Sequence, residues 1–141
     1  MRIGVFLPLD NHIEDPINKA SDMSFNSCQL YCFKPEFYTN DLVDRISSIS
    51  RELKFEITAF FAGWSGYHSF AYPDMYRTIG LIPAYLREKR TKDILDGAEF
   101  AYKLDVKNVF THIGYLPDDP LNRERLEIKD ILAYIADILA K

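Results

Sequence analysis

The sequence lacks several features that mark particular classes of protein. No apolar run approaches the roughly 20 residues that a membrane span needs, and no signal peptide precedes the first apolar run. Basic residues are not in excess, because 17 basic and 21 acidic residues give a net charge of −4. Without a basic stripe, a nucleic-acid partner is disfavoured on electrostatic grounds. These absences predict a cytoplasmic protein whose partners are neither membranes nor nucleic acids.

Cysteine is scarce, and the familiar catalytic motifs are missing. The two cysteines, Cys28 and Cys32, lie four apart in one apolar run. On a strand they would share a face at a separation of about 13 Å, which is too far for a disulfide. A Cys-x3-Cys pair without further ligands nearby is not a zinc motif. There is also no Gly-rich phosphate loop and no G-x-S-x-G elbow. We therefore expect two buried free thiols.

What the chain does contain is a regular alternation of two patterns within a length of one domain, 141 residues. Short apolar runs typical of buried strands occupy residues 2–7, 27–33 and 55–64, and a fourth lies within 107–115. Helical spacing of apolar residues follows each run. The first expected helix begins at Pro16, with Asp15 as its cap, and the second follows a cap at Thr39 or Asn40. The third and fourth begin at Pro83 and Arg123.

Four such βα units predict parallel strands joined by helical crossovers. A closed barrel needs eight units and about 200 residues or more, so this chain corresponds to half of one. The outer strands of a half-barrel would have open edges. A second copy, related by a two-fold axis along the barrel, would close the eight strands. We therefore expect a half TIM barrel completed by a homodimer. An open parallel sheet of flavodoxin type is the alternative fold.

One connection is unusually long. Residues 65–82 separate the third strand from its helix, and they are rich in aromatic and turn residues. Loops of this length are usually functional or disordered. Because this one is so aromatic, we expect an ordered lid or pocket wall.

The order of several short motifs resembles the sugar-phosphate isomerase/epimerase group of the xylose-isomerase-like barrel superfamily. The resemblance covers essentially the whole chain but only the N-terminal half of that family's barrel. The motifs are the first strand and the segments Cys28-Gln29-Leu30-Tyr31, Ile57-Thr58-Ala59-Phe60-Phe61-Ala62-Gly63-Trp64, Thr78-Ile79-Gly80-Leu81-Ile82-Pro83 and Thr111-His112-Ile113-Gly114.

The resemblance implies a metal-dependent enzyme that moves a proton next to the carbonyl of a sugar or sugar phosphate. It implies a divalent metal, Mn, Mg or Zn. The family's usual ligands, two glutamates, an aspartate and a histidine, come from the last four strands of the barrel, and no acidic residue of this chain matches them. The resemblance thus implies the fold and the substrate end of the pocket, and we expect reduced or absent activity, with no residue assigned as catalytic.

Candidate substrate-binding residues follow the strands. His112 ends the fourth strand, on the face where barrel chemistry lies, and the resemblance implies that it touches substrate. It is also the one candidate metal ligand. His68 and Trp64 follow the third strand, where the histidine would orient a hydroxyl and the indole would form an apolar wall. For each of the three, packing within the core or the long loop is the competing interpretation.

Two further candidates, Gln29 and Tyr31, lie on the strand face opposite the cysteines. If that face points into the barrel, they would bond sugar hydroxyls or simply fill the interior. His12 lies in a polar loop and is expected to be exposed. The basic residues that open the third helix, Arg87, Lys89 and Arg90, are expected to form a solvated charged face.

Two other functions remain open. One is a non-catalytic carbohydrate-binding or scaffold protein that keeps the pocket rim without the metal. The other is a fragment of a longer isomerase whose missing half supplies the ligands.

Overall fold

The structure is a computed structural model that describes residues 3–140. Its strands are β1 (Val5–Pro8), β2 (Ser27–Cys32), β3 (Glu56–Ala62) and β4 (Val109–Phe110). Its α-helices are α1 (Glu14–Asp22), α2 (Asn40–Leu53), α3 (Met75–Thr78), α4 (Arg87–Lys103) and α5 (Arg123–Leu139). Two 3₁₀ turns, Pro35–Phe37 and Ala84–Leu86, precede α2 and α4. The expected first strand includes Arg2, which lies outside the described residues.

The sheet has the order β1-β2-β3-β4, and every neighbouring pair is parallel. Each strand therefore pairs with the strand that follows it in the sequence, as in a TIM barrel. A flavodoxin-type sheet would place its second strand outside the first, so that alternative is wrong. The prediction of a four-unit half-barrel is confirmed. β1 and β4 form the two outer strands.

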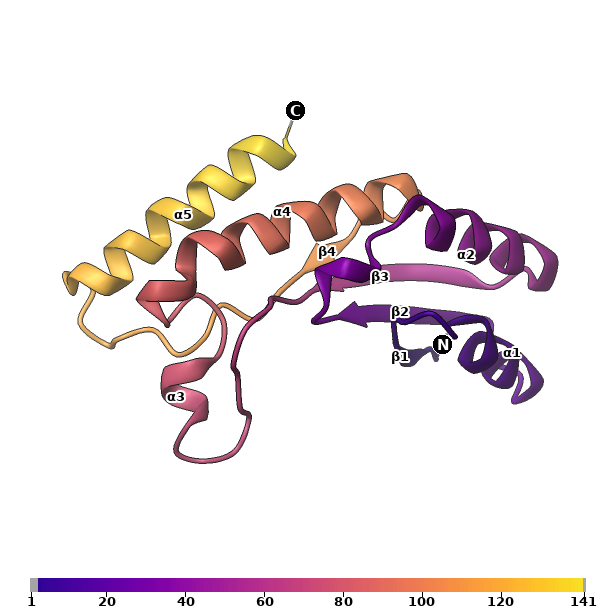
Figure 1. Cartoon of the computed structure of the whole chain (residues 1–141), viewed down its shortest axis with the longest axis horizontal. Coiled ribbons are helices and arrows are strands. Elements are labelled where there is room, and N and C mark those ends of the chain that lie inside the picture. Colours follow the sequence, from indigo (N-terminus) through magenta and orange to yellow (C-terminus); the bar gives the residue numbers. More distant parts are fainter. Residues whose placement is uncertain (1–2, 141) are drawn as a thin grey trace.

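The helices cover one face of the sheet (Figure 1). The alternation of side chains in β2 explains why one face is covered. Cys28, Leu30 and Cys32 point to the helical side and join the main core, and the residues between them are exposed or partly exposed. The helical side contributes Ile17 from α1 and Ile46 from α2 to the same core. Within residues 3–140 the opposite face of the sheet carries no helix, and α3 projects away from the helical layer (Figure 1).

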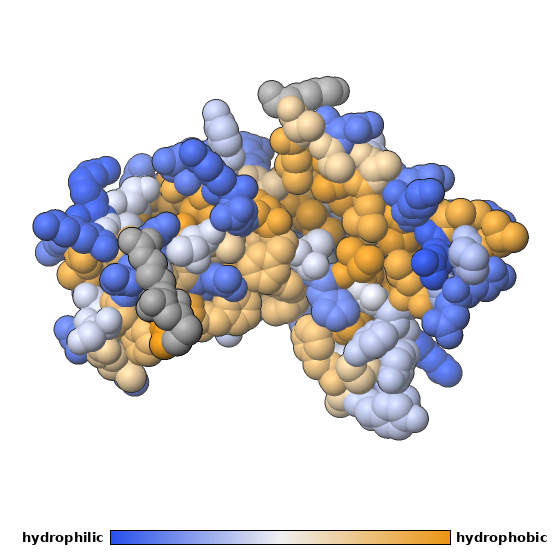
Figure 2. Space-filling model, turned by 180° about the vertical axis from the view of Figure 1, so that it is seen from behind, coloured by the Kyte–Doolittle hydropathy of each residue, from blue (hydrophilic) through white to orange (hydrophobic). Residues whose placement is uncertain are grey.

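The sheet curves toward its uncovered face. The rings of Phe6 in β1 and Phe110 in β4 lie 6.4 Å apart, although three strand spacings of about 4.8 Å would separate the two backbones in a flat sheet. Both side chains are exposed, as is Ile3 beside β1. Broad apolar areas reach the surface on the side of the molecule opposite the view of Figure 1 (Figure 2). The concave face is thus aromatic and open.

The helix ends show which sequence signals were decisive. The Thr39 hydroxyl accepts a hydrogen bond from the Leu42 N–H at 3.3 Å, and the Asn122 side chain caps α5 by accepting from the Glu124 N–H at 2.9 Å. α1 begins at Glu14, two residues earlier than expected, so Asp15 lies inside its first turn and is not the cap. In the first turn, the negative charge of Asp15 still interacts favourably with the positive end of the helix dipole. None of the helices within residues 3–140 has the length and apolar character of a bilayer span.

Burial controls the chemistry of the two thiols. Both cysteines are buried and free, as predicted. Burial raises the pKa of Cys28 to about 12 and that of Cys32 to about 11, because a thiolate loses its hydration there. At mildly alkaline pH we expect both thiols to be inert toward an aromatic disulfide reagent in the native protein and both to react in denaturant. Rapid reaction of either thiol in the native protein would contradict this burial.

Candidate functional site

The carboxyl ends of the four strands meet at one edge of the sheet, and the candidate residues lie there or on the concave face. β2 leads into Phe33, β3 leads into Gly63 and Trp64, and β4 leads into His112. Parallel strands bring these ends together even though their residues lie far apart in the sequence.

His68 lies in an aromatic cluster at this edge. Its ring stacks on Phe33 with centroids 4.8 Å apart, and the rings of Trp64 and Phe70 lie 6.3 and 6.1 Å away. The Nδ1 atom of His68 is 3.0 Å from the carbonyl oxygen of Gly66. Since a carbonyl only accepts, Nδ1 carries the proton, and in the neutral ring Nε2 keeps the free lone pair. The half-buried imidazole can therefore accept a hydrogen bond from a hydroxyl.

Trp64 is fully buried. Phe33 and Phe61 cover its ring, with centroids 5.5 and 5.9 Å away, and the Arg90 guanidinium lies 5.6 Å from the ring centre. Within the described residues its indole Nε1 has no hydrogen-bond partner. In the isolated chain, therefore, the indole presents no surface to a ligand, and it supports the residues around it.

His112 is exposed at the end of β4. Its Nδ1 accepts a hydrogen bond of 3.0 Å from the Gly114 N–H, so this nitrogen is unprotonated and the neutral ring carries its proton on Nε2. The exposed Nε2–H is a donor. His68 and His112 thus offer opposite hydrogen-bonding groups, an acceptor and a donor, at neighbouring strand ends.

The remaining candidates lie deeper on the concave face. Tyr31 is half-buried, and its ring contacts Phe6 at 4.5 Å and Phe33 at 6.3 Å. Gln29 is exposed and lines a hollow of about 360 Å³ with Phe6 and Thr58. That hollow includes Gly4 and Ser27 at the amino ends of the strands. Gln29 therefore faces the concave side as expected but lies toward the opposite end from the histidines. His12, in the β1–α1 loop, is exposed as expected.

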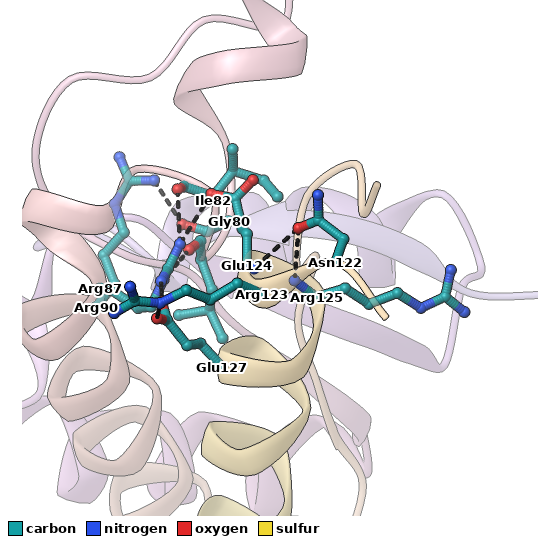
Figure 3. Close-up of polar contacts among 10 residues, drawn as sticks. Gly80, Ile82, Arg87, Arg90, Asn122, Arg123, Glu124, Arg125 and Glu127 are labelled. Carbon is teal, nitrogen blue, oxygen red and sulfur yellow. Dashed lines mark hydrogen bonds and ion pairs between the residues drawn. The ribbon is translucent and has the colours of Figure 1, made fainter. Parts of the chain in front are cut away.

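The expected solvated face at the start of α4 is wrong for two of its three residues. Arg87 and Arg90 are buried. Arg87 pairs with Glu124 at 3.0 Å and Glu127 at 2.7 Å, and donates to the Leu81 carbonyl, so it joins the starts of α4 and α5 (Figure 3). Buried guanidinium groups are stable where such partners use all their donors.

Arg90 holds the two ends of the long aromatic loop together. Its guanidinium donates to four main-chain carbonyls, two on each side of the loop (Figure 3 shows the bond to Gly80). The acceptors and their distances are Ser65 (3.2 Å), Tyr67 (2.8 Å), Thr78 (2.8 Å) and Gly80 (2.6 Å). Burial lowers the pKa of Arg90 to about 10, which still leaves it charged at neutral pH. The prediction of an ordered loop is confirmed, and its anchor is a residue that was expected to lie in solvent.

The third basic residue, Lys89, is exposed and donates to the Ser65 hydroxyl. Asp93, which is buried, accepts from the Ser65 N–H at 2.8 Å and from its hydroxyl at 2.6 Å. These contacts fix the first residue of the loop directly after Trp64.

The far end of the loop docks on the extension of β4. The Leu81 N–H donates to the Ile113 carbonyl at 2.8 Å, and Gly80 makes the approach possible. Its φ is +61°, and a Cβ there would lie 2.1 Å from the Ile113 carbonyl carbon. This contact positions His112 relative to the loop that carries His68.

Gly80→Ala should lower the free energy of unfolding by roughly 3 kcal/mol, because it combines backbone strain with overlap against another backbone segment. Gly66→Ala is the matched control. Gly66 also has a positive φ, +87°, but a Cβ there meets only the Leu86 side chain, so we expect a loss of about 1 kcal/mol. Urea unfolding of both variants measures the difference, and equal losses would contradict the docking contact.

The chain does not fit the metal implied by the resemblance. Residues 3–140 contain no group of three or more histidine, cysteine, aspartate or glutamate side chains that could hold a metal ion. The ring of His112 contacts Gly114 and Tyr115, neither of which brings a carboxylate to it. The side chains of residues 3–140 therefore do not assemble a metal site by themselves.

Comparison with known proteins yields matches among solved structures alone. No family model matches the chain, and no curated protein does. The xylose isomerase domain protein from Planctomyces limnophilus matches 98% of this chain at 21% identity, with a TM-score of 0.86. A D-tagatose 3-epimerase-like protein matches 97% at 16% identity, with a TM-score of 0.61. Endonuclease IV from Thermus thermophilus matches 100% at 15% identity, with a TM-score of 0.63.

The matched region is 50%, 50% and 48% of those three proteins, so this chain spans about half their length. The chain has the fold of one half of a xylose isomerase-like TIM barrel. In this half-barrel, the histidine-bearing edge corresponds to the carboxyl ends of the strands, where TIM barrels place their active sites.

Two features of the site were not predicted. One is the stacking of Phe33 on His68, which depends on the path of the long loop. Arg90 gave no signal, because a basic residue near the start of a helix is normally solvated. An apolar ring directly before the loop, Trp64, is the one sequence feature that could have suggested a buried guanidinium partner.

Proposed function

We propose that this chain is the substrate-binding half of a barrel of the sugar isomerase and epimerase type. The observation that carries the proposal is that His68 and His112 follow the neighbouring strands β3 and β4 at the carboxyl edge of a half-barrel. His68 offers a free Nε2 lone pair, and His112 offers an Nε2–H donor. A sugar carries neighbouring hydroxyl and carbonyl oxygens, and it needs both kinds of partner.

The proposed substrate is a small ketose or aldose, free or phosphorylated. His68 would accept a hydrogen bond from one sugar hydroxyl, while Phe33 and Phe70 provide apolar contact beside it. His112 would donate to a second oxygen. Isomerisation or epimerisation moves a proton next to the carbonyl and needs an acid and a base in contact with that carbon. We assign neither role to a side chain of residues 3–140, and we propose that these residues orient the sugar.

We further propose that a second copy completes the barrel. The outer strands β1 and β4 are parallel, and they occupy the two ends of a curved sheet. A two-fold axis along the barrel would pair β4 of each copy with β1 of the other. It would also cover the exposed rings of Phe6 and Phe110. We also propose that the protein is cytoplasmic.

A non-catalytic sugar-binding protein is the second candidate. It is favoured by the lack of a metal-binding group within residues 3–140. The two candidates bind the same ligands but differ in whether a carbon-bound proton exchanges with solvent.

The test is to incubate the protein with pentuloses, hexuloses and their phosphates in deuterated water, with and without Mn²⁺, and to follow the sugar by NMR. The enzyme proposal predicts deuterium at the carbon next to the carbonyl of at least one sugar. His112→Gln, which keeps a hydrogen-bonding side chain, should weaken binding of that sugar about tenfold through loss of one well-placed donor. His12→Gln is the matched control and should leave binding unchanged.

Broadening of sugar signals without deuterium incorporation would identify the binder. A protein that neither binds nor labels any of these sugars would contradict both candidates. Binding that survives His112→Gln and His68→Gln together would place the sugar elsewhere on the chain.

A further inference from the structure

Four exposed aromatic rings form a continuous row from the tip of the long loop to the end of β4. The ring centroids of Tyr72 and Tyr76 are 6.0 Å apart, those of Tyr76 and Tyr115 are 4.6 Å apart, and those of Tyr115 and His112 are 6.0 Å apart. We call these four residues the tyrosine row. Its segment around α3 forms the pale lobe that projects below the rest of the surface in Figure 2.

The row is not part of either hydrophobic core. Tyr72, Tyr76 and Tyr115 are 80%, 47% and 40% exposed. Their positions are nevertheless fixed, because the Thr78 hydroxyl accepts from the Ser69 N–H at 3.0 Å and closes the segment that carries α3. The Tyr76–Tyr115 contact then joins this segment to the extension of β4. Ordered aromatic rings that remain exposed on a loop are characteristic of a binding surface.

The chemistry of the row matches a saccharide. A tyrosine ring presents a flat apolar face and a hydroxyl at its rim, and a pyranose ring likewise has an apolar C–H face and a rim of hydroxyls. The row contains three such tyrosine rings in succession and ends at the exposed His112. It is therefore longer than a single sugar ring requires.

The charges beside the row select against an anionic ligand. The two segments that carry it, 67–78 and 112–119, contain three exposed aspartates, Asp74, Asp118 and Asp119, and one exposed arginine, Arg77. A second arginine, Arg125, donates to the carbonyls of Pro117 and Asp118 at 3.0 and 3.2 Å. Three negative charges against two positive ones leave a net negative charge, which disfavours a phosphate or a nucleic acid. Carboxylates accept hydrogen bonds from neutral hydroxyls.

We propose that the tyrosine row is an extended subsite for a neutral saccharide of more than one unit, whose terminal unit reaches the strand-end site at His112. This inference rests on the proposed function, because the row leads into the site assigned to the sugar there. It adds the class of substrate: an unphosphorylated oligosaccharide or glycoside.

The test compares maltotriose, cellotriose and xylotriose with glucose, xylose and glucose 6-phosphate by saturation-transfer NMR and calorimetric titration. At least one trisaccharide should bind tenfold or more tightly than its monosaccharide. The double substitution Tyr72→Ala/Tyr76→Ala should remove that advantage and leave monosaccharide binding unchanged. Tyr85→Ala/Tyr102→Ala is the matched control, since these tyrosines are 81% and 83% exposed and lie outside the row; it should bind as the wild type does.

The unfolding midpoint of each variant shows whether it folds, and the single variant Tyr72→Ala replaces the double one if the latter is unstable. Equal affinity for trisaccharides and monosaccharides overturns the extended subsite while the proposed function stands. No binding of any of these saccharides, nor of the pentuloses and hexuloses used to test the proposed function, overturns both. Tighter binding of glucose 6-phosphate than of glucose, lost in the double variant, overturns the neutral class. A changed self-association of the double variant, with unchanged saccharide affinity, would make the row an interface between copies.

Discussion

A parallel sheet that curves and carries helices on one face cannot satisfy its outer strands by itself. β1 and β4 occupy the two ends of the sheet, and the curvature brings Phe6 and Phe110 to within 6.4 Å of each other across the uncovered face. Backbone groups at open edges and exposed rings both favour a further partner. The fold, the open face and the proposed second copy all follow from this one constraint.

The site depends on a second set of contacts at the carboxyl ends of the strands. The aromatic loop keeps its shape because Arg90 binds carbonyls on both sides of it and packs against Trp64. The loop then docks through Gly80 on the extension of β4. Two histidines from different units are thereby held at one edge with opposite hydrogen-bonding polarity. The buried charge of Arg90 thus supports the loop that carries His68 and fixes its position beside the extension of β4.

Periodicity was sufficient to predict the order of strands and helices, because Cys28, Leu30 and Cys32 alternate and because α2 and α5 have clear apolar faces. The count of four units predicted the half-barrel. Individual contacts were harder to predict. Arg90 was expected in solvent because a basic residue near the start of a helix is normally solvated. Its actual acceptors are main-chain carbonyls, which no residue type reveals. Its neighbour in space, Trp64, precedes it by 26 positions in the sequence. Such contacts depend on how the loop closes, and single-sequence patterns do not encode that path.

The mass of the protein in solution, measured by sedimentation equilibrium over a range of concentrations, tests the central claim most directly. The chain has a mass of 16.4 kDa. If two half-barrels close one eight-stranded barrel, the measured mass should be about twice that value, and a charged residue in place of Phe110 should reduce it toward that of the single chain. A wild-type protein that sediments as a single chain at every concentration would contradict closure by a second copy.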